Sequence, residues 1–259
     1  MYSPVTITDL TRMQGDHICV AGYLRDGTCI RPLFPRKRPL TESWVWLKDQ
    51  VVIRPFAEVE LDLQEHTPHP PHTEDYVVSP THYRLFRHLD TARRLALLRK
   101  IEDPSVGSIF GAKIHSDNGW YLTAGQGTRS LGTVRPDEIE KVGYAPRDNN
   151  RWDYRIAFKD AAGAQYRLAV TDLAFRCYLD HARLRERHEP EEIARRVSDT
   201  LRSSEVYLRI GLARGWDKHP DRCHLQITGV YSFPDYLGGK CFADFGMTQK
   251  PPAQVDVPF

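Results

Sequence analysis

The feature of this sequence that most constrains its fold is a two-residue alternation of apolar and polar side chains in short segments. Residues 51–64 alternate in this way, and so do residues 152–159, 165–171, 205–213 and 222–231. Successive side chains of a β-strand point to opposite faces, so this period predicts half-buried strands. Residues 17–24 and 28–33 are two further apolar segments, and the Asp26-Gly27 step between them is a strong hairpin signal. The chain is therefore predicted to be β-rich.

Helical patterns interrupt the strands at three places. Residues 67–80 form a Pro- and His-rich loop, which neither a helix nor a central strand would tolerate. Leucines recur among arginines over residues 83–101, which predicts one helix or two broken near residues 90–91. Helices are also predicted over residues 174–187 and 190–201, the second beginning with Pro190 in its first turn.

A glycine-rich stretch, residues 105–130, divides these elements into two sets. The predicted organisation is a first β-rich unit with a helical extension over residues 1–104, a connector over 105–130, a second β-rich unit with a helical insertion over 131–247, and a flexible tail over 248–259. The fold class is accordingly a mixed, β-rich α+β arrangement.

Charge and cysteine content exclude several classes of protein. The net charge of +2 is too small for a histone-like binder that works by charge alone. The five cysteines include no Cys-x-x-Cys pair, which argues against a zinc ribbon and favours buried, reduced thiols. Neither a membrane-spanning apolar run nor a secretory signal pattern is visible. We expect a cytoplasmic protein that does not associate with membranes.

The last two predicted strands carry candidate binding residues. If alternate residues such as Leu208 and Leu225 point into the core, the opposite face displays Tyr207 and Arg209 beside His224 and Gln226. These side chains suit stacking on bases and reading of base edges. A plain solvated face is the alternative.

Two neighbouring segments extend this candidate site. The loop between those strands holds Arg214 and Trp216, and a loop Trp flanked by cations suits base stacking, although it would also serve as a lid on the core. The hairpin over residues 152–171 displays Arg155, Lys159 and Arg167, a cluster suited to a polyanion unless acids such as Asp153 neutralise it. Arginine supplies 27 of the 36 basic residues, which suits phosphate contacts, but a GC-rich genome would give the same bias.

Catalytic motifs are missing from the sequence. It contains no nucleophile elbow, no phosphate-binding loop of the Walker type, no His-Glu-x-x-His and no dinucleotide-binding glycine pattern after a strand. The one group to weigh is in the His-rich loop, where His72, Glu74 and Asp75 are weak candidates for a metal or for proton transfer, beside His66 and His69. No cofactor is expected.

Several segments resemble the bacterial dual OB-fold domain proteins. They are Ile18-Cys-Val-Ala-Gly-Tyr, Ile30-Arg-Pro-Leu, Ile53-Arg-Pro-Phe, Pro71-His-Thr-Glu-Asp75, Tyr207-Leu-Arg-Ile-Gly-Leu and His224-Leu-Gln-Ile-Thr-Gly-Val-Tyr, spread over residues 5–240. The resemblance implies two OB-like antiparallel barrels with helical insertions, a role in bacterial conflict or antiviral defence, and nucleic-acid or nucleotide binding. It implies no catalytic residue.

The sequence thus leaves three hypotheses. The preferred one is a recognition or adaptor protein that binds single-stranded nucleic acid or RNA. The others are a metal-assisted nuclease or hydrolase that uses the His-rich loop, and a protein-interaction module. In the last case the acidic face at Glu58, Glu60 and Asp62 and the arginines of the predicted helices would dock onto a partner protein, such as the product of a neighbouring gene.

Overall fold

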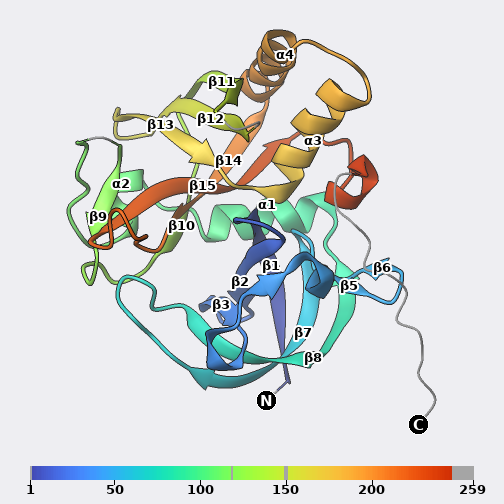
Figure 1. Cartoon of the computed structure of the whole chain (residues 1–259), viewed down its shortest axis with the longest axis vertical. Helices are drawn as coiled ribbons and strands as arrows, with labels where there is room; N and C mark the ends of the chain where they lie inside the picture. Colours follow the sequence, from blue (N-terminus) through green and yellow to red (C-terminus); the bar gives the residue numbers. More distant parts are fainter. Residues whose placement is uncertain (1, 118, 149–150, 247–259) are drawn as a thin grey trace.

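The first half of the chain forms a closed five-stranded barrel. The computed structural model describes residues 2–117, 119–148 and 151–246, and Figure 1 shows this barrel below the second unit. The strands pair in the order β1-β7-β8-β3-β2, and β2 returns to β1. Every pairing in the ring is antiparallel except that of β3 with β8. This is the strand order of an OB fold. The five strands are β1 (Tyr2–Arg12), β2 (His17–Leu24), β3 (Cys29–Leu33), β7 (Ala57–His66) and β8 (Asp75–His88).

The turn between β2 and β3 forms where the Asp-Gly signal predicts it. The Asp26 carboxylate accepts a hydrogen bond of 2.8 Å from the Thr28 backbone, and Gly27 has a φ of 93°, which a residue without a side chain adopts readily. The connection from β3 to β7 contains only short elements. These are η1 (Pro35–Lys37), β4 (Leu40–Thr41), η2 (Glu42–Val45), β5 (Trp46–Leu47) and β6 (Gln50–Val51).

The prediction of a helix over residues 83–101 is wrong in its first part. Strand β8 runs to His88, and α1 occupies only Thr91–Lys100, where Asp90 caps the first turn. Leu85 lies opposite Val59 on β7, so the leucine spacing read as helical belongs partly to an alternating strand. Pro80 also lies inside β8, but between Val78 and Tyr83, where the pairing with β7 is interrupted and no ladder hydrogen bond is lost.

The second half repeats the same connectivity around a second core. Strands β11, β12 and β13 are antiparallel, β13 runs parallel to β15, and β15 pairs with β14. Strand β14 pairs with β10, so within the described residues the sheet does not close onto β11. Its elements are α2 (Val106–Ile109), β9 (Tyr121–Thr123), β10 (Leu131–Val134), β11 (Glu138–Arg147), β12 (Arg151–Lys159), β13 (Gln165–Val170), α3 (Leu173–Leu184), α4 (Pro190–Arg202), β14 (Glu205–Leu212), β15 (Arg222–Phe233) and η3 (Phe242–Phe245).

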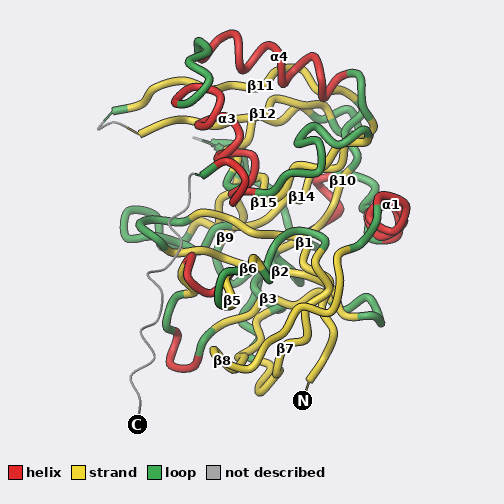
Figure 2. Tube along the Cα trace, turned by 90° about the vertical axis from the view of Figure 1, so that its right-hand side faces the viewer, coloured by secondary structure: helices red, strands yellow, loops and turns green. Residues whose placement is uncertain are grey.

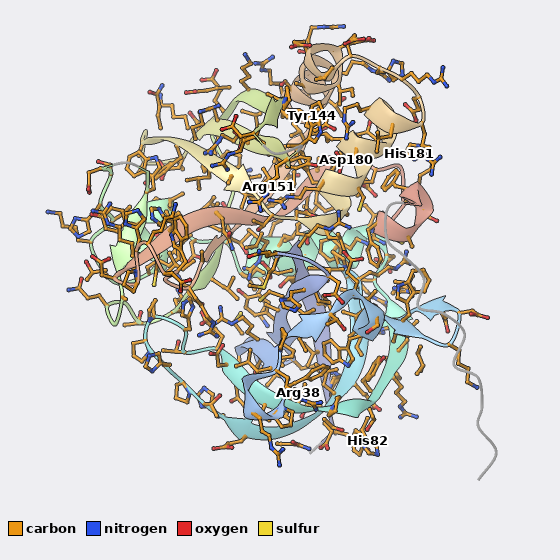
Figure 3. The ribbon with its side chains drawn as sticks, in the orientation of Figure 1. Arg38, His82, Tyr144, Arg151, Asp180 and His181 are labelled. Atoms are coloured by element: carbon orange, nitrogen blue, oxygen red, sulfur yellow. The ribbon has the colours of Figure 1, made fainter. Side chains whose placement is uncertain are left out.

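The helices α3 and α4 are inserted between the third and fourth strands of this unit. Figure 2 shows α4 lying along β11, and its buried residues join the core of the second unit. The Asp180 carboxylate on α3 accepts hydrogen bonds of 2.8 Å from the hydroxyls of Tyr144 and Tyr154, which fastens α3 to β11 and β12 (Figure 3). The predicted connector also contributes to this core, through Val106, Ile109 and Phe110.

The two units pack against each other through a buried polar layer. Arg209 of β14 donates hydrogen bonds to Asp9 of β1 at 3.2 and 3.0 Å, and to the hydroxyl of Tyr23 on β2 at 3.0 Å. Arg31 of β3 donates a hydrogen bond from its Nε to Asp75 and another from its Nη1 to the hydroxyl of Ser130, beside β10. Helix α1 lies beside this seam in both views (Figures 1 and 2). The outer face of the first barrel around β1, β2 and β3 is therefore occupied by the second unit.

The prediction of two OB-like units with helical insertions is confirmed, with one barrel closed and the other an OB-like sheet that α4 covers. In the part of the chain that the structure describes, no helix has the length and apolar character needed to cross a membrane. The predicted tail over 248–259 lies outside the described residues.

Candidate nucleic-acid interface

The outer face of β12, β13 and β15 brings most of the predicted binding residues together. Lys159 lies opposite Gln165, as expected for the predicted hairpin over residues 152–171, and Arg155 lies opposite Ala169. Ala169 in turn pairs with Gln226 of β15. Because alternate residues share a face, Arg155, Lys159 and Arg167 lie on the same side of the sheet as Gln226 and His224.

The cations of this face differ in how much of their charge is available. Arg155 donates a hydrogen bond of 2.6 Å to Asp153, so the predicted neutralisation by that acid holds for this residue. Lys159 and Arg167 have no ion pair among the described residues. Lys159 and Arg167 therefore remain free to meet phosphate.

A row of rings continues the face toward the loop between β14 and β15. The rings are His115, Tyr121, His224, His219 and Trp216, and successive centroids are 5.2, 5.5, 6.3 and 5.6 Å apart. They come from the segment before β9, from β9 itself, from β15 and from the loop. Tyr121 is only 8% exposed, so the row meets solvent mainly through His219 and Trp216, with His115 and His224 half-buried.

Two cations border this row of rings. The guanidinium of Arg222 lies 4.3 Å from the centroid of Tyr121, and the ammonium of Lys218 lies 5.9 Å from that of Trp216. Asp117 bonds to Tyr121 and to Arg222, which balances the charge of that arginine. Partial burial lowers the pKa of His224, and the nearby His219 and Arg222 lower it further.

The loop that carries Trp216 has a fixed local geometry. The backbones of Trp216 and His219 bond to each other in both directions, at 3.4 and 2.7 Å. A Cβ at Gly215 would lie 2.3 Å from the Pro220 carbonyl oxygen, so only glycine fits that position. Trp216 keeps 52% of its surface exposed, and the alternative that it forms a lid on the core is wrong.

The prediction that Tyr207 and Arg209 face solvent is wrong. They lie on the face opposite Leu208 and Ile210, as the alternation requires, but both are fully buried. The first barrel covers that face, where Arg209 pairs with Asp9 and Tyr207 packs with Phe56. Neither side chain is available to a ligand.

The remaining predicted cation, Arg214, lies at the start of the loop and binds the first unit. It is partly exposed, but one guanidinium nitrogen lies 2.6 Å from the Asp75 carboxylate. This contact joins the β14–β15 loop to the β7–β8 loop of the first unit. Arg214 therefore orients the ring-bearing loop.

The His-rich loop does not assemble a metal site. Both Glu74 oxygens accept hydrogen bonds from Ser130 and Leu131, and Asp75 is held by Arg31 and Arg214. Burial lowers the pKa of His72 to about 2, with Arg31 and Arg214 adding to the effect. Over residues 2–117, 119–148 and 151–246, no three His, Cys, Asp or Glu residues are placed to hold one metal ion.

Sequence reasoning missed His115, Tyr121 and Arg222 as members of this surface. Tyr121 pairs with His224 across β9 and β15, a contact between residues about a hundred positions apart. The loop residues before Trp120 show no two-residue alternation, so the local sequence did not mark this segment as part of the sheet. The proximity of His115 and Tyr121 to the loop of Trp216 follows from the sheet pairing, whereas Arg222 directly follows that loop in the chain.

Two OB-like units, one covered over the outer face of β1, β2 and β3 and the other with an exposed face of cations and rings, define a dual OB-fold protein. A family model described as a Dual OB-containing domain matches residues 11–230, more than half of the chain. The chain belongs to this family. No curated protein matches the sequence.

Proposed function

We propose that this protein binds single-stranded nucleic acid, DNA or RNA, along the outer face of β12, β13 and β15 and the loop that follows β14. The observation that carries the proposal is the row of rings that ends at the exposed Trp216, with Lys218 beside it. Aromatic platforms beside cations are the means by which OB folds hold unpaired bases.

The covered face of the first unit supports placing the site on the second. In an OB fold the ligand face lies over strands two and three with the loop between strands four and five. In the first unit that face carries Tyr23 and Arg31, and the second unit occupies it. In the second unit the equivalent face carries Lys159 and Arg167, and the equivalent loop carries Trp216.

A single strand suits this surface better than a duplex. The exposed Trp216 ring offers its faces to bases that are not already stacked in a helix, and Lys159 and Arg167 supply few phosphate contacts. A net charge of +2 over the chain also argues against a broad electrostatic interface.

The binding test is fluorescence anisotropy with short labelled single strands of DNA and RNA. We expect Trp216→Ala to weaken binding about 5- to 150-fold, the equivalent of one lost stacked base. Phe86→Ala is the matched control, because Phe86 is also an exposed ring, 55% exposed, but lies on β8 of the first unit. Equal affinity of both variants and the wild type would place the site elsewhere.

The charge test uses the same assay at several salt concentrations. With a few phosphates contacted, the slope of log affinity against log salt should be about −2 to −4 for a single strand. Replacing Lys159 and Arg167 together by Ala should make the slope shallower by about 1.4. Arg38→Ala, an exposed charge on the first unit (Figure 3), should leave it unchanged. A slope near about −8 that Trp216→Ala does not affect would contradict a stacking site.

Two of the alternatives receive less support from the side-chain contacts. Glu58 and Glu60 face Arg87 and Arg84 across β7 and β8 and pair with them, so the acidic face and the arginines neutralise each other instead of a partner.

The nuclease alternative predicts divalent metal in the purified protein and cleavage of labelled strands, measured in the same samples. A role as the recognition or adaptor part of a bacterial defence system stays a prediction from the resemblance, tested by co-purification with neighbouring gene products.

A further inference from the structure

A pocket opens at the seam between the two units, apart from the row of rings. It has a volume of about 390 Å³, within the usual range for small-molecule sites. Three segments meet there: the β2–β3 turn with Thr28, the β7–β8 loop with Glu74, and the segment before β10 with Arg129. None of the residues that line the pocket belongs to the proposed interface for single-stranded nucleic acid.

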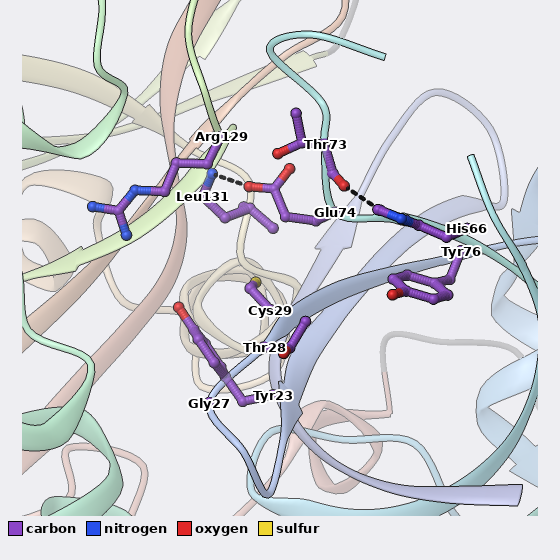
Figure 4. Close-up of a pocket in the computed structure, with 10 residues that line it drawn as sticks. All are labelled: Tyr23, Gly27, Thr28, Cys29, His66, Thr73, Glu74, Tyr76, Arg129 and Leu131. Atoms are coloured by element: carbon purple, nitrogen blue, oxygen red, sulfur yellow. Dashed lines mark hydrogen bonds between the residues drawn. The ribbon is translucent and has the colours of Figure 1, made fainter. Parts of the chain in front are cut away.

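Two sides of the pocket carry aromatic rings, those of Tyr23, His66 and Tyr76. His66 stacks on Tyr76 with centroids 4.4 Å apart and an interplanar angle of 18°. The His66 ring is fixed by a 2.8 Å contact between its Nε2 and the Thr73 carbonyl oxygen. Figure 4 shows Tyr23 at one side of the pocket and the His66–Tyr76 pair at the other, with Thr28 and Cys29 between them. Such walls suit a flat ring.

The polar groups of the pocket favour a ligand that donates hydrogen bonds. Oε1 of Glu74 accepts from the backbones of Ser130 and Leu131 at 2.6 and 3.1 Å, whereas among the described residues Oε2 accepts from the Ser130 hydroxyl alone, at 2.8 Å. A carboxylate oxygen accepts about two hydrogen bonds, so Oε2 has one acceptor position left. Arg129 is held by Asp103 and by the Ile109 carbonyl, which leaves the carboxylate as the dominant charge of the lining.

We propose that this pocket binds the base of a purine nucleoside that carries an exocyclic amine, adenine or guanine. The base stacks on Tyr76, and its amine donates to Oε2 of Glu74. Burial raises the pKa of Cys29 to about 12, so the neighbouring thiol stays neutral and adds no second negative charge. Uracil and thymine have no such amine, and hypoxanthine has a carbonyl oxygen where adenine carries its amine and a C–H where guanine carries its own.

The test is isothermal titration calorimetry with adenosine, guanosine, inosine and uridine. Adenosine or guanosine should bind the wild-type protein at least about tenfold more tightly than inosine and uridine, the loss expected for an unmade hydrogen bond to a charged group. Thr28→Tyr, at an exposed position on the rim, should fill the pocket and abolish binding. Thr200→Tyr, an exposed threonine on α4, is the matched control.

A second variant tests the carboxylate directly. Glu74→Gln keeps an oxygen for the two backbone donors but places an amide donor where the ligand amine would bind, so the preference for adenosine or guanosine over inosine should disappear. Equal binding of all four nucleosides, no binding at millimolar concentrations, or unchanged binding to Thr28→Tyr would each overturn the proposal. Trp216→Ala should leave nucleoside binding unchanged, so failure of the strand interface and failure of this pocket are distinguishable.

Discussion

Replacing Arg209 together with its partner Asp9 should destabilise the protein by clearly less than the sum of the two single replacements. Arg209 is fully buried and Asp9 is nearly so. The guanidinium donates to both Asp9 oxygens, to the Tyr23 hydroxyl and to the Thr133 hydroxyl, and its second terminal nitrogen lies 2.9 Å from Asp9. Thr228 adds a further bond to Asp9, of 2.5 Å. The pair therefore holds the two units together through a fully dehydrated network.

The expected magnitudes follow from which charges are left without a partner. Arg209→Met leaves the Asp9 carboxylate buried with only hydroxyl donors, which should cost about 3 to 5 kcal/mol of the free energy of unfolding. Asp9→Leu leaves the guanidinium buried and should cost a similar amount. Replacing both removes both stranded charges, so the double variant should cost at least about 2 kcal/mol less than the sum of the two single variants.

Urea-induced unfolding, followed by circular dichroism and tryptophan fluorescence, measures these differences. The slope of the free energy against urea should be the same for all four proteins, since the surface exposed on unfolding barely changes. The reasoning fails if either single variant costs less than about 1 kcal/mol, or if the double variant costs the full sum. Either result would mean that water or a rearranged side chain replaces the lost partner.

Three further outcomes are expected. Oligonucleotide affinity should rise as pH falls through the histidine range, because bound phosphate favours the charged form of His224, whose pKa the unliganded protein holds low, and anisotropy that does not change with pH would contradict this. Glu58→Gln should cost about 1.5 to 3 kcal/mol of the free energy of unfolding at neutral pH, because burial raises the pKa of Glu58 but its two arginine partners lower it by more. The difference from the wild type should vanish as the pH falls through the folded-state pKa, which urea unfolding at several pH values would measure. Gly22→Ala should destabilise the first barrel by about 1 to 3 kcal/mol or more, because the added Cβ would lie 2.4 Å from the Thr6 carbonyl oxygen, and a thermal midpoint equal to that of the wild type would refute the contact.

Local patterns were sufficient to predict most elements. The Asp26-Gly27 turn, the alternation in β12 through β15 and the start of α4 at Pro190 depend on residues within a few positions of each other. The same patterns misled where two periods overlap. In β8 the leucines were counted toward the helix that begins only after Asp90.

For the candidate site, too, local patterns predicted some features and not others. Alternation correctly placed Lys159 and Arg167 on one face of their hairpin and Gln226 on the outward face of its own strand, because a strand's pleat alone decides which of its side chains share a side. It could not decide which faces remain exposed to solvent. Tyr121 joined the site through the pairing of β9 with β15, and that pairing is not encoded in either segment by itself.

The sequence by itself determined the strands, the hairpins and the division of each strand into two faces. Only the tertiary structure decided that the face with Arg209 is interior and the face with Lys159 is free. Whether an arginine is solvated depends on the surface that approaches it, and the carboxylate that Arg209 meets is 200 residues away in the chain. Burial is a property of two surfaces together, and the pattern of one strand describes only one of them.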